Sequence, residues 1–166
     1  MLKSISNLSH QFVEAMAAAA SGVSIVTTAG AQGRFGLTVS AITSVSAEPP
    51  LLLACINRKS LISEAITSHK FFAASLLSEH QVALAGSFAG KPSHGPSYDF
   101  ASAEWREGRG GSPVLEHAAA TFELELDSWH DAGTHRIFVG KVLAASISGL
   151  PTLAYHHRKF GKFVAF

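Results

Sequence analysis

The feature that most restricts the fold is a pair of long extended segments, residues 118–129 and 134–148, joined by the short stretch 130–133. In the first segment apolar and acidic residues alternate: Phe122, Leu124 and Leu126 against Glu123, Glu125 and Asp127. This alternation is typical of a β-strand with one buried face. Because so short a connection joins antiparallel neighbours, the two segments predict a long β-hairpin.

Four more segments predict strands: one is rich in β-branched residues, one is full of Ser and Thr, one is a short continuous apolar run, and the last is the apolar stretch after the second helix. Gly and Pro turns such as 29–34 separate the first of them. The four segments cover residues 22–28, 35–46, 51–56 and 70–77. Helices are predicted at three places only. The first is 8–20, capped by Ser6, Asn7 or Ser9, the second begins at Ser60 and ends near 69, and the third follows the capping box 78–81 and ends near 88.

The way these elements are joined indicates the fold class. Most strands are connected by short turns, and helices occupy few junctions, which favours a mainly β, antiparallel barrel with peripheral helices over a parallel doubly wound sheet. Residues 89–113 form one long loop rich in Gly, Pro and Ser, and the tail 153–166 is aromatic and basic. No repeat or linker divides the chain, so we expect a single domain over residues 1–166.

The balance of apolar and charged residues restricts the partners. Of the residues, 47% are hydrophobic and only 15% are charged, which favours a buried interface between subunits over an Ala-rich monomer. The net charge of +1 and the scattered basic residues argue against nucleic-acid binding. No membrane-spanning segment or secretion signal is recognisable, and the one cysteine, Cys55, excludes a disulfide framework. We therefore expect a cytoplasmic protein.

Common catalytic motifs are missing from the sequence. It contains no G-x-G-x-x-G dinucleotide fingerprint, no P-loop, no G-x-S-x-G elbow and no H-E-x-x-H zinc motif. There are nine histidines, but pairs such as His130 with His135, or His156 with His157, have no strong ligand spacing. We expect no metal site.

The segment 36–41 carries hydroxyl side chains on a predicted strand. Thr38 and Ser40 lie two residues apart and so share one face. They form either an exposed polar face or a surface where a flat ligand lies close to the backbone and bonds to hydroxyl and main-chain groups.

A polar, basic turn follows the predicted buried strand 51–56 and opens a helix. Asn57, Arg58, Lys59 and Ser60 offer a phosphate site at the helix N-terminus, or an ordinary capped helix with two solvated cations. Taken alone, His135 fits a turn or surface position better than a catalytic one. Tyr155 and Arg158 are compatible with plain packing and surface charge.

These segments, in this order, resemble the flavin reductase family with the FMN-binding split-barrel fold. The resemblance runs from about Glu14 to Lys159. It is carried by the segments 22–28, 36–41, 44–46, 49–53 and 55–57 with Ser60, by Phe71, Leu76, Leu77, Gln81, Leu84 and Phe88, and by 98–100 with Trp105, 111–115, 135–140, and Tyr155 with Arg158. It implies a homodimeric NAD(P)H-dependent enzyme that transfers hydride from NADH or NADPH to FMN, or to FAD, and supplies reduced flavin to a partner monooxygenase.

The resemblance also assigns roles to residues. It implies that the isoalloxazine ring and ribityl chain contact Thr38, Val39, Ser40 and Ala41. The ribityl and phosphate end meets Asn57, Arg58, Lys59 and Ser60, and the outer edge of the cofactor lies along Ser87, Phe88 and Ala89. His135 is placed where the nicotinamide stacks on the flavin, and Tyr155 and Arg158 close the site.

Two departures from the family pattern affect these expectations. Many relatives carry an acidic residue directly before the histidine, whereas this chain has Thr134, with Asp131 further back. The segment 89–97 also differs from the usual charged loop. Two alternatives stay open: a flavoenzyme of the same fold that reduces a corrinoid or a ferric chelate, and a non-catalytic protein of this fold that binds flavin or haem.

Overall fold

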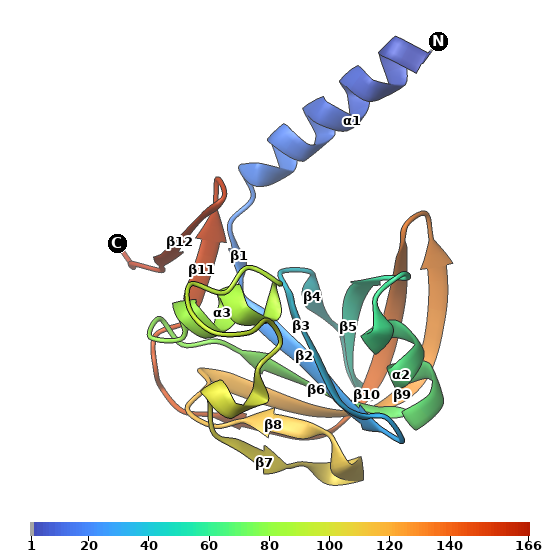
Figure 1. Ribbon diagram of the computed structural model, residues 1–166, viewed down its shortest axis with the longest axis vertical. Helices are drawn as coiled ribbons and strands as arrows, with labels where there is room; N and C mark the ends of the chain where they lie inside the picture. Colours follow the sequence, from blue (N-terminus) through green and yellow to red (C-terminus); the bar gives the residue numbers. More distant parts are fainter. Residues whose placement is uncertain (1) are drawn as a thin grey trace.

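The computed structural model describes residues 2–166, and its central feature is the predicted long hairpin (Figure 1). Its two strands pair antiparallel within a seven-stranded sheet of order β3-β2-β6-β9-β10-β5-β4, in which every pairing is antiparallel. The seven strands are β2 Ser24–Gly30, β3 Gly33–Val39, β4 Ile42–Ala47, β5 Pro50–Asn57, β6 Phe71–Leu76, β9 Ala120–Ala132 and β10 His135–Ile147. The predicted mainly β, antiparallel fold is confirmed.

The sheet curls because its two edge strands follow each other in the chain. β3 and β4 lie at opposite edges of the sheet order, yet only Ser40 and Ala41 separate them. The Cys55 backbone N–H donates to the Ala41 carbonyl at 2.9 Å, which ties this connection to the far side of the sheet. Opposite edges therefore lie side by side, as in a barrel that is split between β3 and β4.

Smaller elements cover the outside of the sheet. A three-stranded sheet of order β1-β11-β12 and a two-stranded β7–β8 hairpin complete the β structure. Their bounds are β1 Ser21–Gly22, β7 Trp105–Glu107, β8 Pro113–Leu115, β11 Leu153–His156 and β12 Lys159–Lys162. The helices are α1 Leu2–Ala17, α2 Leu61–His69 and α3 Val82–Phe88, with short 3₁₀ turns η1 Phe100–Ser102 and η2 Arg109–Gly111. Figure 1 shows α1 projecting away from the body.

Two hydrophobic cores meet at β2, which is buried on both of its faces. Val26 packs inside the barrel with Phe72 and Phe138, where Ile62 and Ile66 of α2 close one end. On the outer face the core runs from Val23 and Ile25 through α3 to β8 and β11, and it comprises Val23, Ile25, Leu77, Leu84, Ala85, Phe88, Leu115, Ala118 and Leu153. The continuous apolar and β-branched run of β2 fits this doubly covered position.

The structure corrects several predicted boundaries. The first helix begins at Leu2 and ends at Ala17, so Ser6, Asn7 and Ser9 lie inside it and none caps it. The predicted strand 35–46 is two strands, because the chain leaves one sheet edge for the other at Ser40 and Ala41. The turns are tighter than predicted, with strands separated only by 31–32 and by 133–134. The predicted loop 89–113 contains η1, β7 and η2 and leads directly into β8.

Candidate functional site

A cleft of about 410 Å³ lies where the end of β3 meets α3 and the turn between β11 and β12. We call it the hairpin cleft. The sequence-predicted residues on its walls are Thr38, Val39, Ser40, Ala89, Tyr155 and Arg158. Val23, Gly86, Lys91 and Phe160 also line it and were not predicted. Residues from distant parts of the chain therefore meet in one cleft.

The β3 wall of the hairpin cleft is held rigidly. The Thr38 hydroxyl donates to the Ala85 carbonyl at 2.8 Å and so ties β3 to α3. Val39 is buried in the barrel core, whereas Ser40 and Ala41 are exposed in the connection to β4. Thr38 is thus a packing tether as well as a wall, and Ser40 presents the free hydroxyl.

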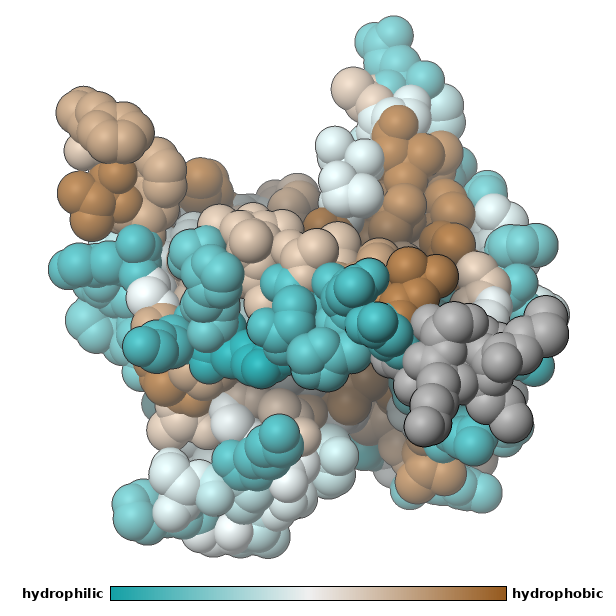
Figure 2. All heavy atoms as spheres, turned by 90° about the horizontal axis from the view of Figure 1, so that it is seen from above, coloured by the Kyte–Doolittle hydropathy of each residue, from teal (hydrophilic) through white to brown (hydrophobic). Residues whose placement is uncertain are grey.

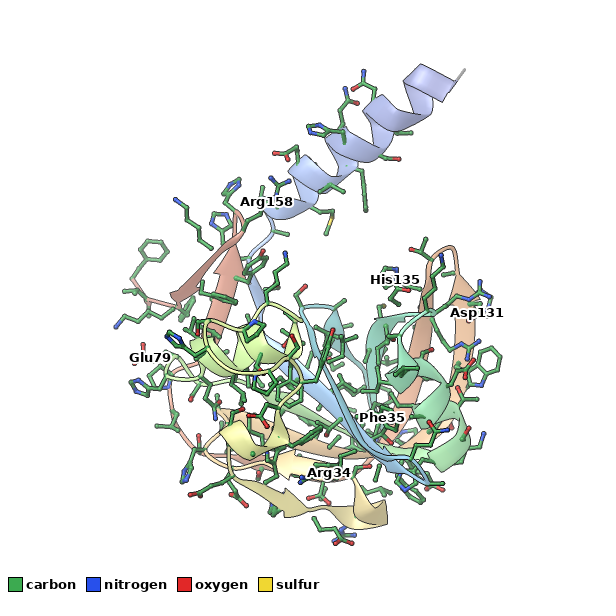
Figure 3. All side chains as sticks on the ribbon, viewed as in Figure 1. Arg34, Phe35, Glu79, Asp131, His135 and Arg158 are labelled. Atoms are coloured by element: carbon green, nitrogen blue, oxygen red, sulfur yellow. The ribbon has the colours of Figure 1, made fainter. Side chains whose placement is uncertain are left out.

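The opposite wall belongs to the C-terminal hairpin. The Tyr155 ring lies 5.4 Å from that of Phe160 on the neighbouring strand, centroid to centroid. Arg158 occupies the turn between β11 and β12 with a left-handed φ of 61° and pairs with Glu14 of α1. In Figure 3, Arg158 lies beside the end of α1 nearest the body. Arg158, which lines the hairpin cleft, is therefore held by an ion pair with a residue of α1 that lies outside the cleft.

Two of the predicted cofactor residues turn into the protein. Phe88 is completely buried and packs against Phe100 and Trp105, with ring centroids 5.0 and 5.5 Å away. Ser87 is buried too, and its hydroxyl binds the Pro96 carbonyl and the Asp99 N–H, each at 3.4 Å. Among residues 87–89, only Ala89 lines the hairpin cleft.

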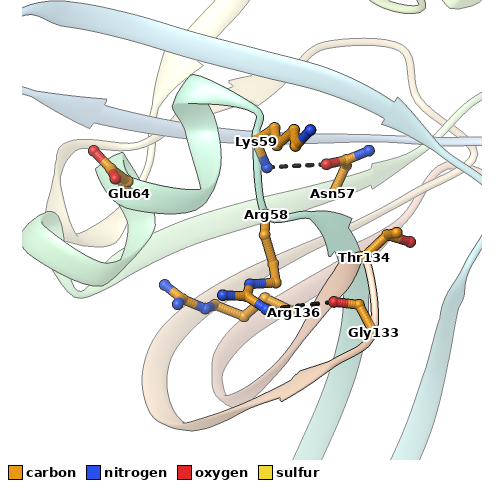
Figure 4. Close-up of a pocket in the computed structure, with 7 residues that line it drawn as sticks. All are labelled: Asn57, Arg58, Lys59, Glu64, Gly133, Thr134 and Arg136. Carbon is orange, nitrogen blue, oxygen red and sulfur yellow. Dashed lines mark hydrogen bonds between the residues drawn. The ribbon is translucent and has the colours of Figure 1, made fainter.

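A second pocket, of about 540 Å³, lies at the junction of β5 with α2 (Figure 4). We call it the junction pocket, and its walls include Asn57, Arg58 and Lys59 together with Thr134. Asn57 Oδ1 accepts a hydrogen bond from the Lys59 N–H at 2.9 Å, a local Asx-type turn that shapes the basic segment. Ser60 stands at the N-cap position, but its hydroxyl donates to the Asn57 carbonyl at 2.6 Å and accepts no capping hydrogen bond from the helix N–H groups.

An acidic residue next to the junction pocket organises its arginines. Asp131 accepts two hydrogen bonds from Arg136, at 2.7 and 3.0 Å, and pairs with Arg58 at 3.3 Å. The hydrogen bonds from Arg136 hold the pKa of Asp131 below its ordinary value. Arg136 also lies 4.0 Å above the Trp129 ring and was not predicted as a site residue. The only feature of the sequence that could have indicated Arg136 is its position opposite Asp131 across the short turn of the long hairpin.

His135 lies near the junction pocket. It begins β10, pairs in register with Asn57, and has its Nδ1 2.9 Å from the Thr134 hydroxyl. Figure 3 shows His135 and Asp131 at the tip of the long hairpin, on a different arm of the molecule from Arg158. Within one chain, the structure brings His135 to the basic segment 57–60 but not to the C-terminal hairpin.

Residues 2–166 offer neither a metal site nor a membrane-spanning helix. No group of three or more His, Cys, Asp or Glu side chains there is placed to hold a metal ion. No helix in this part of the chain combines the length and the apolar character needed to span a membrane.

Comparison with known proteins identifies the family. Residues 16–163 match the family model described as flavin reductase like domain. The FMN reductase (NADH) RutF of Variovorax paradoxus (strain S110) is 38% identical over 152 residues, covering 91% of this chain and 83% of the relative.

Solved structures agree with this assignment. BorF, the flavin reductase component of a bacterial two-component tryptophan halogenase, has a TM-score of 0.84 and 30% identity, covering 95% of this chain and 99% of its own. The Streptomyces globisporus C-1027 NADH:FAD oxidoreductase SgcE6, solved with NAD and FAD fragments, has a TM-score of 0.84 and 28% identity, covering 93% and 92%. With its distant segments assembled into the same fold and a family model matched along nearly its whole length, this chain belongs to the flavin reductase family.

Proposed function

We propose that this chain is an NAD(P)H-dependent flavin reductase that binds FMN or FAD and delivers electrons as reduced flavin. The observation that carries the proposal is the hairpin cleft, where residues 38–40, Ala89, Tyr155 and Arg158 converge from separate parts of the chain. Relatives named FMN reductase (NADH) and NADH:FAD oxidoreductase support the same chemistry.

The residues present fit a flavin. The exposed Ser40 hydroxyl and the adjoining backbone suit the polar edge of a planar ring system, and the Tyr155 ring offers an aromatic wall. At the junction pocket, Lys59 forms no ion pair with any described carboxylate, so its ammonium is available to a phosphate. When bound, a flavin accepts hydride from a reduced nicotinamide and carries the electrons onward.

The tasks of the protein are binding, orientation and exclusion of water. Asn57, Lys59 and Ser60 hold the phosphate end, and Ser40 with its neighbouring N–H groups holds the ring. Asp131 keeps the Arg58 guanidinium at the wall of the junction pocket. His135, with its imidazole oriented by Thr134, lies away from the C-terminal hairpin of its own chain, so we propose that it positions the nicotinamide against a flavin held by the hairpin of a second copy. These assignments account for the site without a nucleophile.

A homodimer is part of the proposal. Leu8, Phe12 and Met16 follow one another at four-residue spacing along α1 and are 54–68% exposed, so they form an apolar stripe on a helix that stands away from the body. Figure 2 shows apolar side chains left open among polar ones on the face seen from above. Burial of this stripe against a second copy fits the low content of charged residues.

The electron acceptor we propose is a partner monooxygenase that takes up the reduced flavin. The support is that structural neighbours such as BorF serve as reductase components of two-component systems. The alternative acceptors are a corrinoid and a ferric chelate. Comparing the rate of electron transfer to each acceptor with that to a partner monooxygenase, under the same conditions, distinguishes them.

The test is an anaerobic stopped-flow experiment in which the protein with FMN or FAD is mixed with NADH or NADPH. Bleaching of the visible flavin absorbance at a rate that depends on nicotinamide concentration is the expected result. Tight flavin binding without bleaching by either nucleotide would contradict the enzymatic proposal and leave a flavin-binding protein.

A further inference from the structure

A third cleft, of about 350 Å³, lies between β3, the start of α2 and the long loop, outside the hairpin cleft. Its walls include the aromatic rings of Phe35, Tyr98 and Phe100, and its rim carries Arg34 and Lys59. We call it the aromatic cleft. Its volume lies within the range of about 300–1,000 Å³ that is usual for small-molecule sites.

The rim of the aromatic cleft carries uncompensated positive charge. The Arg34 guanidinium lies 4.7 Å from the centroid of the Phe100 ring, which places a cation over an aromatic wall. Among the described residues, neither Arg34 nor Lys59 forms an ion pair with a carboxylate. A cleft with aromatic walls and two available cations has the chemistry to bind a planar heterocycle linked to phosphate.

Tyr98 presents an aromatic surface without a partner. Its side chain is 49% exposed, although its backbone N–H is fixed by a hydrogen bond of 3.1 Å to the Ser87 carbonyl. Phe100, in contrast, is held from behind by Trp105, with ring centroids 5.0 Å apart. Because Arg34 already lies over Phe100, the half-exposed Tyr98 ring is the one that a stacked base would cover.

The aromatic cleft adjoins the proposed phosphate end of the flavin site. Lys59 lines both the junction pocket and the aromatic cleft, and Ser60 lines the latter beside it. A nucleotide whose first phosphate lies at Lys59 can extend its second phosphate toward Arg34 and its base toward the rings. FMN ends at its single phosphate, whereas FAD continues through a diphosphate into adenosine.

From this shared residue we infer that the aromatic cleft binds the adenosine half of FAD, with the adenine stacked on Tyr98 and the diphosphate between Lys59 and the Arg34 guanidinium that lies over Phe100. The inference rests on the proposed function and deepens it, because it makes this chain prefer FAD to FMN. Stacking of a base on an aromatic side chain is worth about 5- to 150-fold in affinity. The preference for FAD should lie in that range.

Equilibrium titration followed by flavin fluorescence tests this inference without any turnover. Dissociation constants for FAD and FMN are measured for the unaltered chain and for Tyr98→Ala and Arg34→Ala, and each substitution should lower the ratio of FAD to FMN affinity about tenfold. Tyr98→Phe keeps the ring and should retain the ratio. Lys141→Ala removes an exposed lysine of β10 that lines none of these three clefts and should also leave the ratio unchanged.

Three outcomes would overturn the inference. One is equal affinity for FAD and FMN in the unaltered chain, and another is an equal loss for both flavins in Tyr98→Ala and Arg34→Ala. The third is that Tyr98→Ala and Arg34→Ala raise the KM for NADH and leave the affinity for FAD unchanged, which would assign the aromatic cleft to the nicotinamide nucleotide. Rapid bleaching of FMN by NADH alongside any of these results leaves the proposed function standing, so the two failures are distinguishable.

Discussion

Substitution of Glu123, a buried carboxylate on β9, should loosen the hairpin that braces the aromatic cleft. Only 6% of Glu123 is exposed. Its carboxylate accepts a hydrogen bond of 2.7 Å from the Arg109 N–H and one of 2.8 Å from the Arg106 guanidinium. These bonds attach η2 and the β7–β8 hairpin to the main sheet, and Trp105 of β7 packs against Phe100. The Glu123 carboxylate therefore attaches the segment 106–109 of the long loop to β9.

The size of the effect follows from these two bonds. A hydrogen bond to a charged group contributes about 1.5–3 kcal/mol, but Arg106 is half exposed and its share is reduced by solvent. Glu123→Gln keeps an acceptor oxygen and loses the charge, so we expect the free energy of unfolding to fall by about 2 kcal/mol at neutral pH. Glu116→Gln removes an exposed partner of the same arginine and should cost less than about 0.5 kcal/mol.

The effect should also depend on pH with a definite sign. Burial alone raises the pKa of Glu123, but the bonds from Arg109 and Arg106 outweigh it and hold the pKa below the ordinary value of 4.5. A depressed pKa in the folded state gives stability that is present above the unfolded pKa and is lost as the pH falls through the folded one. The difference between the unaltered chain and Glu123→Gln should therefore shrink below pH 4.5.

Urea unfolding at neutral and acidic pH measures both quantities, and hydrogen exchange at the β7 and β8 amides locates the change. Equal destabilisation by Glu123→Gln at both pH values would refute the electrostatic reasoning. A loss no larger than that of Glu116→Gln would refute the attaching role of the Glu123 carboxylate.

Three further predictions concern the site, the helix and the fold. His135→Ala should lower kcat/KM for NADH about 10- to 100-fold in the stopped-flow assay, and an unchanged rate would remove His135 from the site. Phe12→Glu on α1 should shift dimers toward monomers in analytical ultracentrifugation, while His10→Glu, on another face of that helix, should not; a monomeric unaltered chain would contradict this. Gly110→Ala should cost about 2–4 kcal/mol in unfolding free energy, because φ is +74° and the added Cβ would lie 2.2 Å from Phe71 Cγ; an unaltered Tm would contradict that clash.

The long hairpin and most strands could be predicted from the sequence because alternation is a local signal. The break at Ser40 and Ala41 could not, since the run of Ser, Thr and β-branched residues continues through it and only the closing of the sheet separates β3 from β4. Glu123 shows the same limit. It belongs to the polar face of a correctly predicted strand, yet a hairpin distant in the chain covers it.

The candidate site divides in the same way. Residues 38–40, Ala89, Tyr155 and Arg158 were predicted and share a cleft, although their meeting depends on β11 pairing with β1. Phe88 was predicted at the cofactor edge, but its ring fills the outer core because α3 turns that face inward. Asp131 was noted only as a departure from the family pattern, and its role in holding Arg58 emerges from contacts across the β5–α2 junction.

The two walls of the hairpin cleft differ in stiffness. One is the end of β3, within the seven-stranded sheet and tied to α3, whereas the other is the β11–β12 hairpin, whose outer strand β12 is exposed along its whole length. Local opening has the lowest free energy where few apolar contacts are buried, so we expect the C-terminal hairpin to move more readily than β3. The residence time of a ligand in this cleft is then governed by how often that hairpin opens, and changes in β12 should alter dissociation rates more than association rates.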